Sequence, residues 1–179
     1  MNYATIKKYD IANGPGVRVS LFVSGCRHQC KGCFNQVAWD FNYGKVFTKE
    51  VEDELIDAIK PDYIEGITIL GGEPFEAENQ RGLLPFIKRI KEEFPNKTIW
   101  VFSGFLLDKE ILGESRANCE VTKELLSYID FMVDGRFEES LKDIALIFKG
   151  SSNQRIINVR ETLKEGRIVL SPLNDKKSF

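Results

Sequence analysis

The architecture of this chain is clearest at Ile67-Thr68-Ile69-Leu70-Gly71-Gly72-Glu73-Pro74, where a short apolar run ends at two glycines. Such a run, rich in β-branched residues and bounded by glycine and proline, predicts a buried strand over residues 67–70. Further along, apolar Leu84, Ile87 and Ile90 recur at helical spacing and predict a helix over Leu83–Phe94. A buried strand followed by a helix is the unit from which α/β proteins with parallel sheets are built.

The same unit is repeated on both sides of this stretch. Strands are expected at Val17–Val23, Thr98–Phe102 and Phe131–Val133, and helices at Lys49–Ile59 and Thr122–Tyr128. Thr48 is a reasonable N-cap for the helix that follows it. Weaker strand candidates lie at Ile144–Phe148 and Ile168–Leu170. The alternation predicts an α/β fold with a parallel sheet.

Glycine-rich and polar segments follow the predicted strands directly. They are Ser24-Gly25-Cys26, Gly71-Gly72-Glu73-Pro74, Ser103-Gly104 and Asp134-Gly135-Arg136. In α/β folds with parallel strands, ligands bind outside the carboxyl ends of the strands. We therefore expect these four segments to lie together and to form a binding site.

Length and composition favour one globular domain over residues 1–179. The 179 residues are 42% hydrophobic and 29% charged, and their formal net charge of −2 offers no strongly basic surface to nucleic acid. No apolar run approaches the roughly 18 residues of a membrane-spanning helix. The start of the chain, Met1–Lys8, lacks the apolar core of a signal peptide. We expect a cytoplasmic protein with neither nucleic acid nor membrane among its partners.

Three of the four cysteines, Cys26, Cys30 and Cys33, fall within the short segment CRHQCKGC. Clustering of this kind in a cytoplasmic chain points to a metal site rather than to disulfides. Iron–sulfur clusters of the [4Fe–4S] type normally take four protein thiolates, so these three would leave one iron open to a small molecule. We predict that the three cysteines hold such a cluster.

A structural zinc site is the alternative interpretation of the cysteines. Zinc in such sites takes four ligands, often in pairs such as C-x2-C, and the fourth here would have to be His28 or Cys119. His28 lies between two of the cysteines, where joint ligation is awkward, and Cys119 has no second cysteine beside it. We interpret His28 as a loop residue and Cys119 as a buried or incidental thiol.

The spacing Cys-x3-Cys-x2-Cys, with aromatic Phe34 after the last cysteine, resembles the radical S-adenosylmethionine superfamily. The resemblance implies that S-adenosylmethionine chelates the open iron and is cleaved by the reduced cluster to methionine and a 5′-deoxyadenosyl radical. Gly71–Pro74 resembles the GGEP motif that contacts the cofactor's amino group, and Asp134–Arg136 resembles a D-x-K element with arginine in place of lysine. The implied cofactor-binding residues are Gly32, Cys33, Phe34, Gly71, Gly72, Glu73, Pro74, Ser103, Asp134 and Arg136.

The length of the chain bears on the fold that this resemblance implies. A full (β/α)8 barrel typically takes about 250 residues, so we expect a partial, open β/α barrel of the radical S-adenosylmethionine type. Its lateral opening should be wide, which suits a protein segment as substrate better than a small molecule. The chain has no second cysteine cluster, and chemistry at an auxiliary cluster is not expected.

Two further segments narrow the resemblance. Asn13–Arg18 is similar to the GPG-R segment of the glycyl-radical activating enzymes, and Gly150–Arg155 (GSSNQR) to the activating proteins of anaerobic ribonucleoside-triphosphate reductase. The resemblance implies an oxidoreductase that abstracts a hydrogen atom from one glycine of the reductase's glycyl-radical subunit. It also implies a reducing electron donor such as flavodoxin. Lys149, before GSSNQR, stands where arginine is common in the family.

Two other functions stay open from the sequence. One is activation of another glycyl-radical enzyme, such as pyruvate formate-lyase, although those activases tend to be longer and to lack GSSNQR. The other is a non-enzymatic zinc or electron-transfer module, which would leave Gly71–Pro74 unexplained. For GSSNQR itself, the alternatives are a plain surface loop and a contact with cofactor or partner at the mouth of the site.

Overall fold

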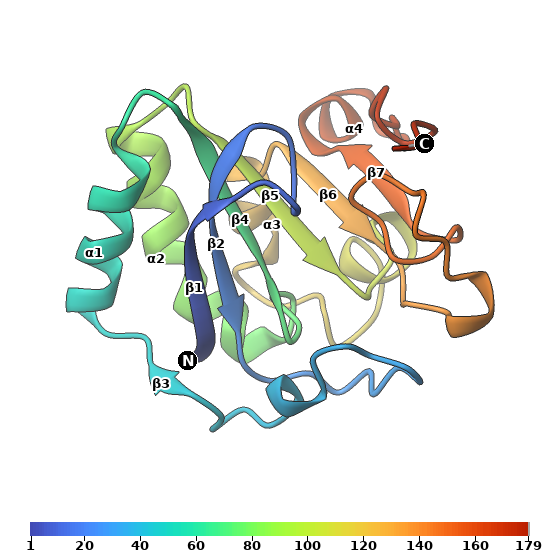
Figure 1. Cartoon of the computed structure of the whole chain (residues 1–179), viewed down its shortest axis with the longest axis horizontal. Helices are drawn as coiled ribbons and strands as arrows, with labels where there is room; N and C mark the ends of the chain where they lie inside the picture. The colour runs from blue at the N-terminus through green and yellow to red at the C-terminus, as the bar shows by residue number, and fades with distance from the viewer. Residues whose placement is uncertain (179) are drawn as a thin grey trace.

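Seven strands form one mixed sheet in the computed structural model, which describes residues 1–178 (Figure 1). The strands lie side by side in the order β3-β1-β2-β4-β5-β6-β7, so the sheet is open, with β3 and β7 at its edges. Their bounds are Asn2–Asp10 (β1), Val17–Val23 (β2), Lys45–Val46 (β3), Ile64–Gly71 (β4), Thr98–Ser103 (β5), Phe131–Asp134 (β6) and Arg155–Asn158 (β7).

The four central strands, β2, β4, β5 and β6, are parallel, as predicted. Their ends are in register, because Val23 pairs with Gly71 and Ser103 pairs with Asp134. The segments that follow these strands therefore lie together beyond the carboxyl ends of the strands, where the loop after β2 runs in Figure 1.

The expectation of a purely parallel sheet is wrong at both flanks. β1 and β7 pair antiparallel with β2 and β6, and the short β3 pairs antiparallel with β1. The β1–β2 connection, residues 11–16, explains one of these pairings, since a parallel crossover needs a dozen residues or more. The α/β class is confirmed, with a mixed sheet in place of a parallel one.

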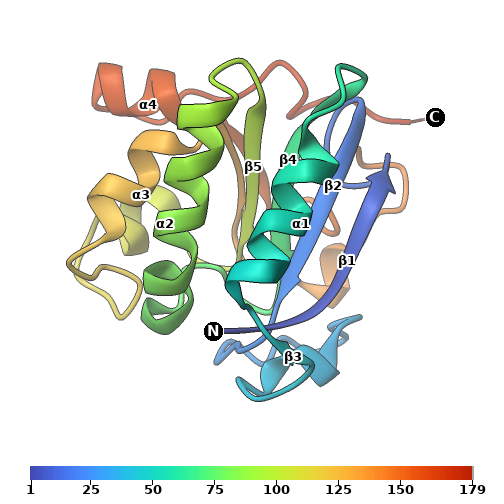
Figure 2. The same ribbon diagram turned by 90° about the vertical axis from the view of Figure 1, so that its left-hand side faces the viewer.

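Three of the four α-helices cover one face of the sheet (Figure 2). The α-helices are α1 (Lys49–Ile59), α2 (Ala77–Glu93), α3 (Thr122–Tyr128) and α4 (Val159–Glu165), and single turns of other helix types lie at Gln36–Trp39, Leu107–Ile111 and Glu139–Leu141. The predicted bounds of α1 and α3 are confirmed, and Thr48 caps α1 by accepting a 3.4 Å bond from the Val51 N–H. Within residues 1–178, none of the helices has the length and apolarity to cross a bilayer.

α2 begins six residues before the predicted start, at Ala77 rather than Leu83. Its first turns bury Asn79 and Gln80, which are polar, so apolar periodicity does not reveal them. Burying these amides is possible because both are hydrogen-bonded to backbone carbonyls.

The two weaker strand predictions are wrong. Ile144–Phe148 and Ile168–Leu170 form no strands and share only single bridges with other segments. β1, β7 and α4, in contrast, had no prediction, because each is short or lies at a flank where the apolar pattern is weak.

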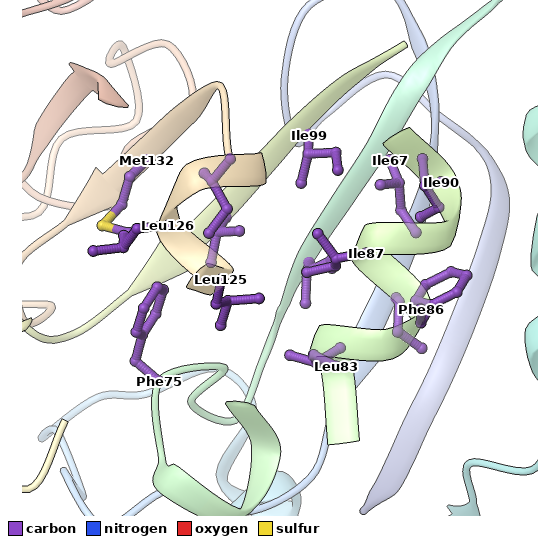
Figure 3. Packing of buried hydrophobic residues seen from close by; sticks show 14 of the residues in the cluster. Ile67, Phe75, Leu83, Phe86, Ile87, Ile90, Ile99, Leu125, Leu126 and Met132 are labelled. Carbon is purple, nitrogen blue, oxygen red and sulfur yellow. The ribbon is translucent and has the colours of Figure 1, made fainter. Parts of the chain in front are cut away.

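The main core lies between the sheet and α1, α2 and α3. Figure 3 shows Leu83, Ile87 and Ile90 of α2 beside Ile67 and Ile99 of the sheet, and Leu125 and Leu126 of α3 near Met132. Burying each such side chain contributes about 1.5–3 kcal/mol. This packing fixes the strands whose ends carry the glycine-rich segments.

The opposite face of the sheet carries a smaller apolar cluster. Since side chains alternate along a strand, Trp100 and Val133 point away from the helices and form this cluster with Ile156. Phe102 and Phe148 pack against it and also line a cavity. The fold thus leaves room for a ligand on the face that the helices do not cover.

Candidate functional site

A cavity of about 450 Å³ lies at the carboxyl ends of the parallel strands. Every one of the four predicted strand-end segments contributes to its wall, through Cys26, Gly71–Glu73, Ser103–Gly104 and Gly135. The sheet register therefore brings together the segments that the sequence singled out.

All three clustered cysteines line this cavity, together with Gly32 and Phe34. The thiols are free and partly exposed, and the Cys33 sulfur accepts a 3.4 Å bond from the Asn35 N–H. Burial raises the pKa of the Cys26 thiol to about 12 and also raises that of Cys30. A metal that binds these sulfurs therefore has to displace their protons.

Three thiols on one cavity wall fit the donor set of an iron–sulfur cluster. Among residues 1–178, no group of three or more His, Cys, Asp or Glu side chains is gathered closely enough to hold one metal ion. A single zinc ion needs sulfur ligands about 2.3 Å from one point. A [4Fe–4S] cluster binds each thiolate to a different iron, so its sulfur ligands need not be equally close to one point.

The backbone at the start of the cysteine loop is held by the segment that follows β4 and by the turn at Gln36–Trp39. The Glu73 N–H donates to the Gly25 carbonyl at 2.8 Å, and the Cys26 N–H donates to the Trp39 carbonyl at 3.1 Å. Gly72 has no room for a side chain, because a Cβ there would lie 2.6 Å from the Gly25 oxygen. Close backbone approach is thus the reason for glycine at this position.

The buried carboxylate of Glu73 joins three segments of the site. One oxygen accepts from the Ser103 hydroxyl and the Phe75 N–H, both at 2.8 Å. The other accepts from the Gly104 N–H at 2.7 Å and lies 2.8 Å from the His28 Nε2. A carboxylate has about four acceptor positions, so these partners occupy Glu73 fully.

His28 is the side chain whose role the sequence did not reveal. The sequence placed it in a loop, which is correct, but its side chain is only 3% exposed and lies against Glu73. Its ring also meets the edge of Phe105, with the ring centroids 4.3 Å apart. The one available signal was composition, since this is the chain's single histidine and it lies between two of the clustered cysteines.

Asp134 and Arg136 do not reach the cavity wall, although Gly135 between them does. Asp134 is fully buried and accepts from Arg155 at 2.9 and 2.6 Å and from the Leu107 N–H at 2.8 Å. Arg136 pairs with Glu110 at 2.8 Å, which raises its pKa. Pro74 is likewise buried outside the lining. The other predicted cofactor-binding residues all line the cavity.

Three successive side chains of GSSNQR donate hydrogen bonds to the three residues of the Asp134–Arg136 turn. Asn153 donates to the Arg136 carbonyl at 2.8 Å, Gln154 to the Gly135 carbonyl at 2.9 Å, and Arg155 to the Asp134 carboxylate. These bonds continue the β6–β7 ladder, in which Asp134 pairs with Arg155. Gly150 and Gln154 line the cavity, so this segment belongs to the site and is no plain surface loop.

Asn13–Arg18 supports the cavity from the other end. Asn13 lines it, while the Arg18 guanidinium is buried and donates to the Thr68 hydroxyl at 2.8 Å and to the Ile67 carbonyl at 2.9 Å. Burial lowers the pKa of Arg18 to about 10. A Cβ on Gly14 would lie 2.8 Å from the Arg18 side chain, so glycine at this position makes room for it.

Comparison with known proteins gives one consistent result. Residues 12–157 match the family model described as a 4Fe-4S single cluster domain. The chain is 42% identical to the anaerobic ribonucleoside-triphosphate reductase-activating protein of Haemophilus influenzae over 158 residues, which are 87% of this chain and 97% of that protein. It is 40% identical to the protein of the same name from Escherichia coli (strain K12) over 162 residues, 89% of this chain and 100% of that protein. The protein of that name from Enterobacteria phage T4 is 36% identical over 158 residues, 87% and 93% of the two chains.

Proposed function

This chain belongs to the family of anaerobic ribonucleoside-triphosphate reductase-activating proteins, and on that premise we propose that it is a radical S-adenosylmethionine activase. Its substrate is a glycine of the reductase's glycyl-radical subunit. Cys26, Cys30 and Cys33 hold the cluster that the family model describes.

One observation carries this proposal. The three cysteines and the Gly71–Glu73 segment line the same cavity, so a cluster on the thiolates would face a pocket for a small molecule. Three thiolates leave one of four irons without a protein ligand. A cluster held by Cys26, Cys30 and Cys33 would, when reduced, supply the one electron that cleaves S-adenosylmethionine to methionine and a 5′-deoxyadenosyl radical. Taking a hydrogen atom from the glycine would convert that radical to 5′-deoxyadenosine and leave the radical on the glycine.

In this proposal, the residues of the chain bind the cofactor and orient it. Gly71 and Gly72 form the part of the pocket wall that would face the methionine part of the cofactor, and Gly32, Phe34 and Ser103 form further parts of it. Glu73 acts by holding Ser103, Gly104 and His28 in place, since its oxygens are already occupied. Pro74, Asp134 and Arg136, which do not line the pocket, would support the residues that do.

The fold suits a protein segment as the second substrate. We propose that the open sheet is a partial β/α barrel of the radical S-adenosylmethionine type and that residues 1–179 form one such domain. The cavity lies on the face that the helices leave free, and apolar Phe102 and Phe148 line it. A reducing protein such as flavodoxin, in the cytoplasm, would supply the electron.

Anaerobic spectroscopy tests the proposed function in two steps. The protein is purified without oxygen, and the EPR spectrum of its reduced cluster is recorded with and without S-adenosylmethionine. The reductase is then added, and a glycyl-radical doublet is expected together with 5′-deoxyadenosine. A colourless zinc protein would contradict the cluster, and a doublet on pyruvate formate-lyase alone would reassign the partner.

A further inference from the structure

We infer that His28 is a positioning residue whose bond to Glu73 orients the cysteine loop, and with it the open iron, toward the cofactor pocket. The inference rests on the proposed function and adds a role for a side chain that is neither a cluster ligand nor part of the cofactor motif. Its support comes from the contacts of the imidazole, the space made for it and the backbone it restrains.

The contacts define how the imidazole is held. The His28 Nε2 lies 2.8 Å from a Glu73 carboxyl oxygen, within hydrogen-bond distance. The other ring nitrogen, Nδ1, lies 3.4 Å from the Arg116 guanidinium. Both nitrogens thus have a protein partner, which leaves neither free to bind iron.

The absence of a side chain at Gly104 leaves the space that the His28 imidazole occupies. A Cβ on Gly104 would lie 2.6 Å from the His28 Cδ2, so any larger residue there would push the ring away from Glu73. Phe105 lies against the ring from another side, and Arg116 stacks over the Phe105 ring at 4.7 Å. Gly104 and Phe105, which follow β5, therefore pack directly against the His28 ring.

The backbone beside His28 needs such a restraint. Gln29, between His28 and Cys30, has a φ of 52°, a left-handed conformation that is unfavourable for a residue other than glycine. Strained residues persist only where the surroundings hold them. Arg27 adds a second anchor by pairing with Glu76 at 2.7 Å, but its side chain is 48% exposed, so His28 is the better-shielded of the two.

Partners that orient metal ligands from outside the coordination shell typically affect metal affinity or activity by about 10- to 100-fold. We expect an effect of that size on cofactor binding at the cluster. Assembly of the cluster itself should change little, because all three thiolates remain.

Two substitutions of equal chemistry and different length test the inference. The amide nitrogen of His28→Gln lies about as far along the side chain as Nε2 and can still donate to Glu73, whereas that of His28→Asn cannot reach it. Each protein is reconstituted anaerobically, its iron and sulfide are counted, and the reduced cluster is titrated with S-adenosylmethionine by EPR. Arg81→Gln, which breaks an exposed pair with Glu120, is the control.

The expected result is wild-type iron content in both variants, with the half-saturating cofactor concentration raised about 10- to 100-fold in His28→Asn and restored in His28→Gln. If His28→Asn does not fold, as judged by its circular dichroism, His28→Phe, which keeps a ring of similar size but has no donor for Glu73, should give the same shift. Unchanged cofactor binding in the folded variant overturns the role of His28. If the EPR spectrum of the reduced wild-type cluster does not change when S-adenosylmethionine is added, the proposed function is overturned instead.

Discussion

At the scale of single residues, the three clustered cysteines differ from Cys119 in position and expected consequence. Cys26, Cys30 and Cys33 line the cavity, whereas Cys119 lies outside its wall and is near the Thr122 hydroxyl at 3.5 Å. We expect alanine at any one of the three to abolish 5′-deoxyadenosine formation and to lower bound iron, because a cluster ligand is lost.

Cys119→Ser is the matched control for these substitutions. It should keep wild-type iron content and cofactor cleavage, measured by iron assay and by chromatography of 5′-deoxyadenosine under reducing anaerobic conditions. Collapse of the cluster in Cys119→Ser would contradict the assignment of an open iron, as would cleavage that persists in a Cys26→Ala protein.

The cysteine spacing could be interpreted from the sequence because ligands on one short loop are local. The roles of Glu73 and His28 could not, because they depend on a contact across 45 positions of the chain. The resemblance assigned the Gly71–Pro74 motif to the cofactor's amino group, and within that motif the oxygens of Glu73 accept bonds from protein donors. Only the fold could show which donors lie within reach.

At the scale of elements, β7 and the end of β6 are joined by the Arg155–Asp134 pair. Arg155→Ala would leave the fully buried Asp134 without its cation, and breaking a buried pair in this way costs about 3–5 kcal/mol. We therefore expect a large decrease in the free energy of unfolding, measured by urea titration at pH 7.

Arg160→Ala is the matched control, since Arg160 is 56% exposed and Asp130 keeps its bond to Lys91. Because the buried Asp130 carboxylate keeps Lys91 as its cation, we expect Arg160→Ala to cost less than Arg155→Ala. Equal destabilisation by the two substitutions would show that Asp134 does not depend on Arg155 more than Asp130 depends on Arg160.

The elements that the sequence predicted best are those with a full apolar pattern. β2, α1 and α3 begin and end where predicted, because their inward-facing residues are apolar and their ends carry polar signals. The first turns of α2 were not predicted because Asn79 and Gln80, which are polar, are buried there as hydrogen-bonded amides. Ile144–Phe148 was mistaken for a strand because its apolar Leu146 and Phe148 line the cavity, and Phe148 also covers a small cluster, instead of joining the sheet.

At the scale of the whole molecule, the open sheet connects the two ends of the cavity. The cysteine loop forms one wall beyond the strand ends, and Ala12 and Asn13, between β1 and β2, form part of another. The far end of β1 pairs with β2 at Asp10 and Arg18 only after a register shift, and side-chain bonds add to that pairing. Asp10 supplies them, by accepting from the Asn13 amide and the Ser20 hydroxyl, both at 2.7 Å.

These bonds predict how stability depends on pH. Burial alone would raise the pKa of Asp10, but the bonds from Asn13 and Ser20 outweigh it, and the pKa is lowered. Glu52 and Glu110 also have lowered pKa values, because bonds from Lys49, Arg89 and Arg136 outweigh burial. A carboxyl whose pKa is lower in the folded state stabilises the fold above its unfolded pKa, about 4, and loses this contribution as the pH falls through the folded value.

The free energy of unfolding should therefore be nearly constant between pH 7 and pH 5 and should fall steeply below about pH 4. Asp10→Asn separates one contribution from the rest: it should cost about 1–3 kcal/mol at pH 7, where the wild-type carboxylate accepts its bonds, and have a shallower acid slope. Urea unfolding of the metal-free wild type and variant at five pH values measures both quantities. Parallel acid slopes would mean that Asp10 does not couple the cavity wall at Ala12 and Asn13 to the stability of the sheet.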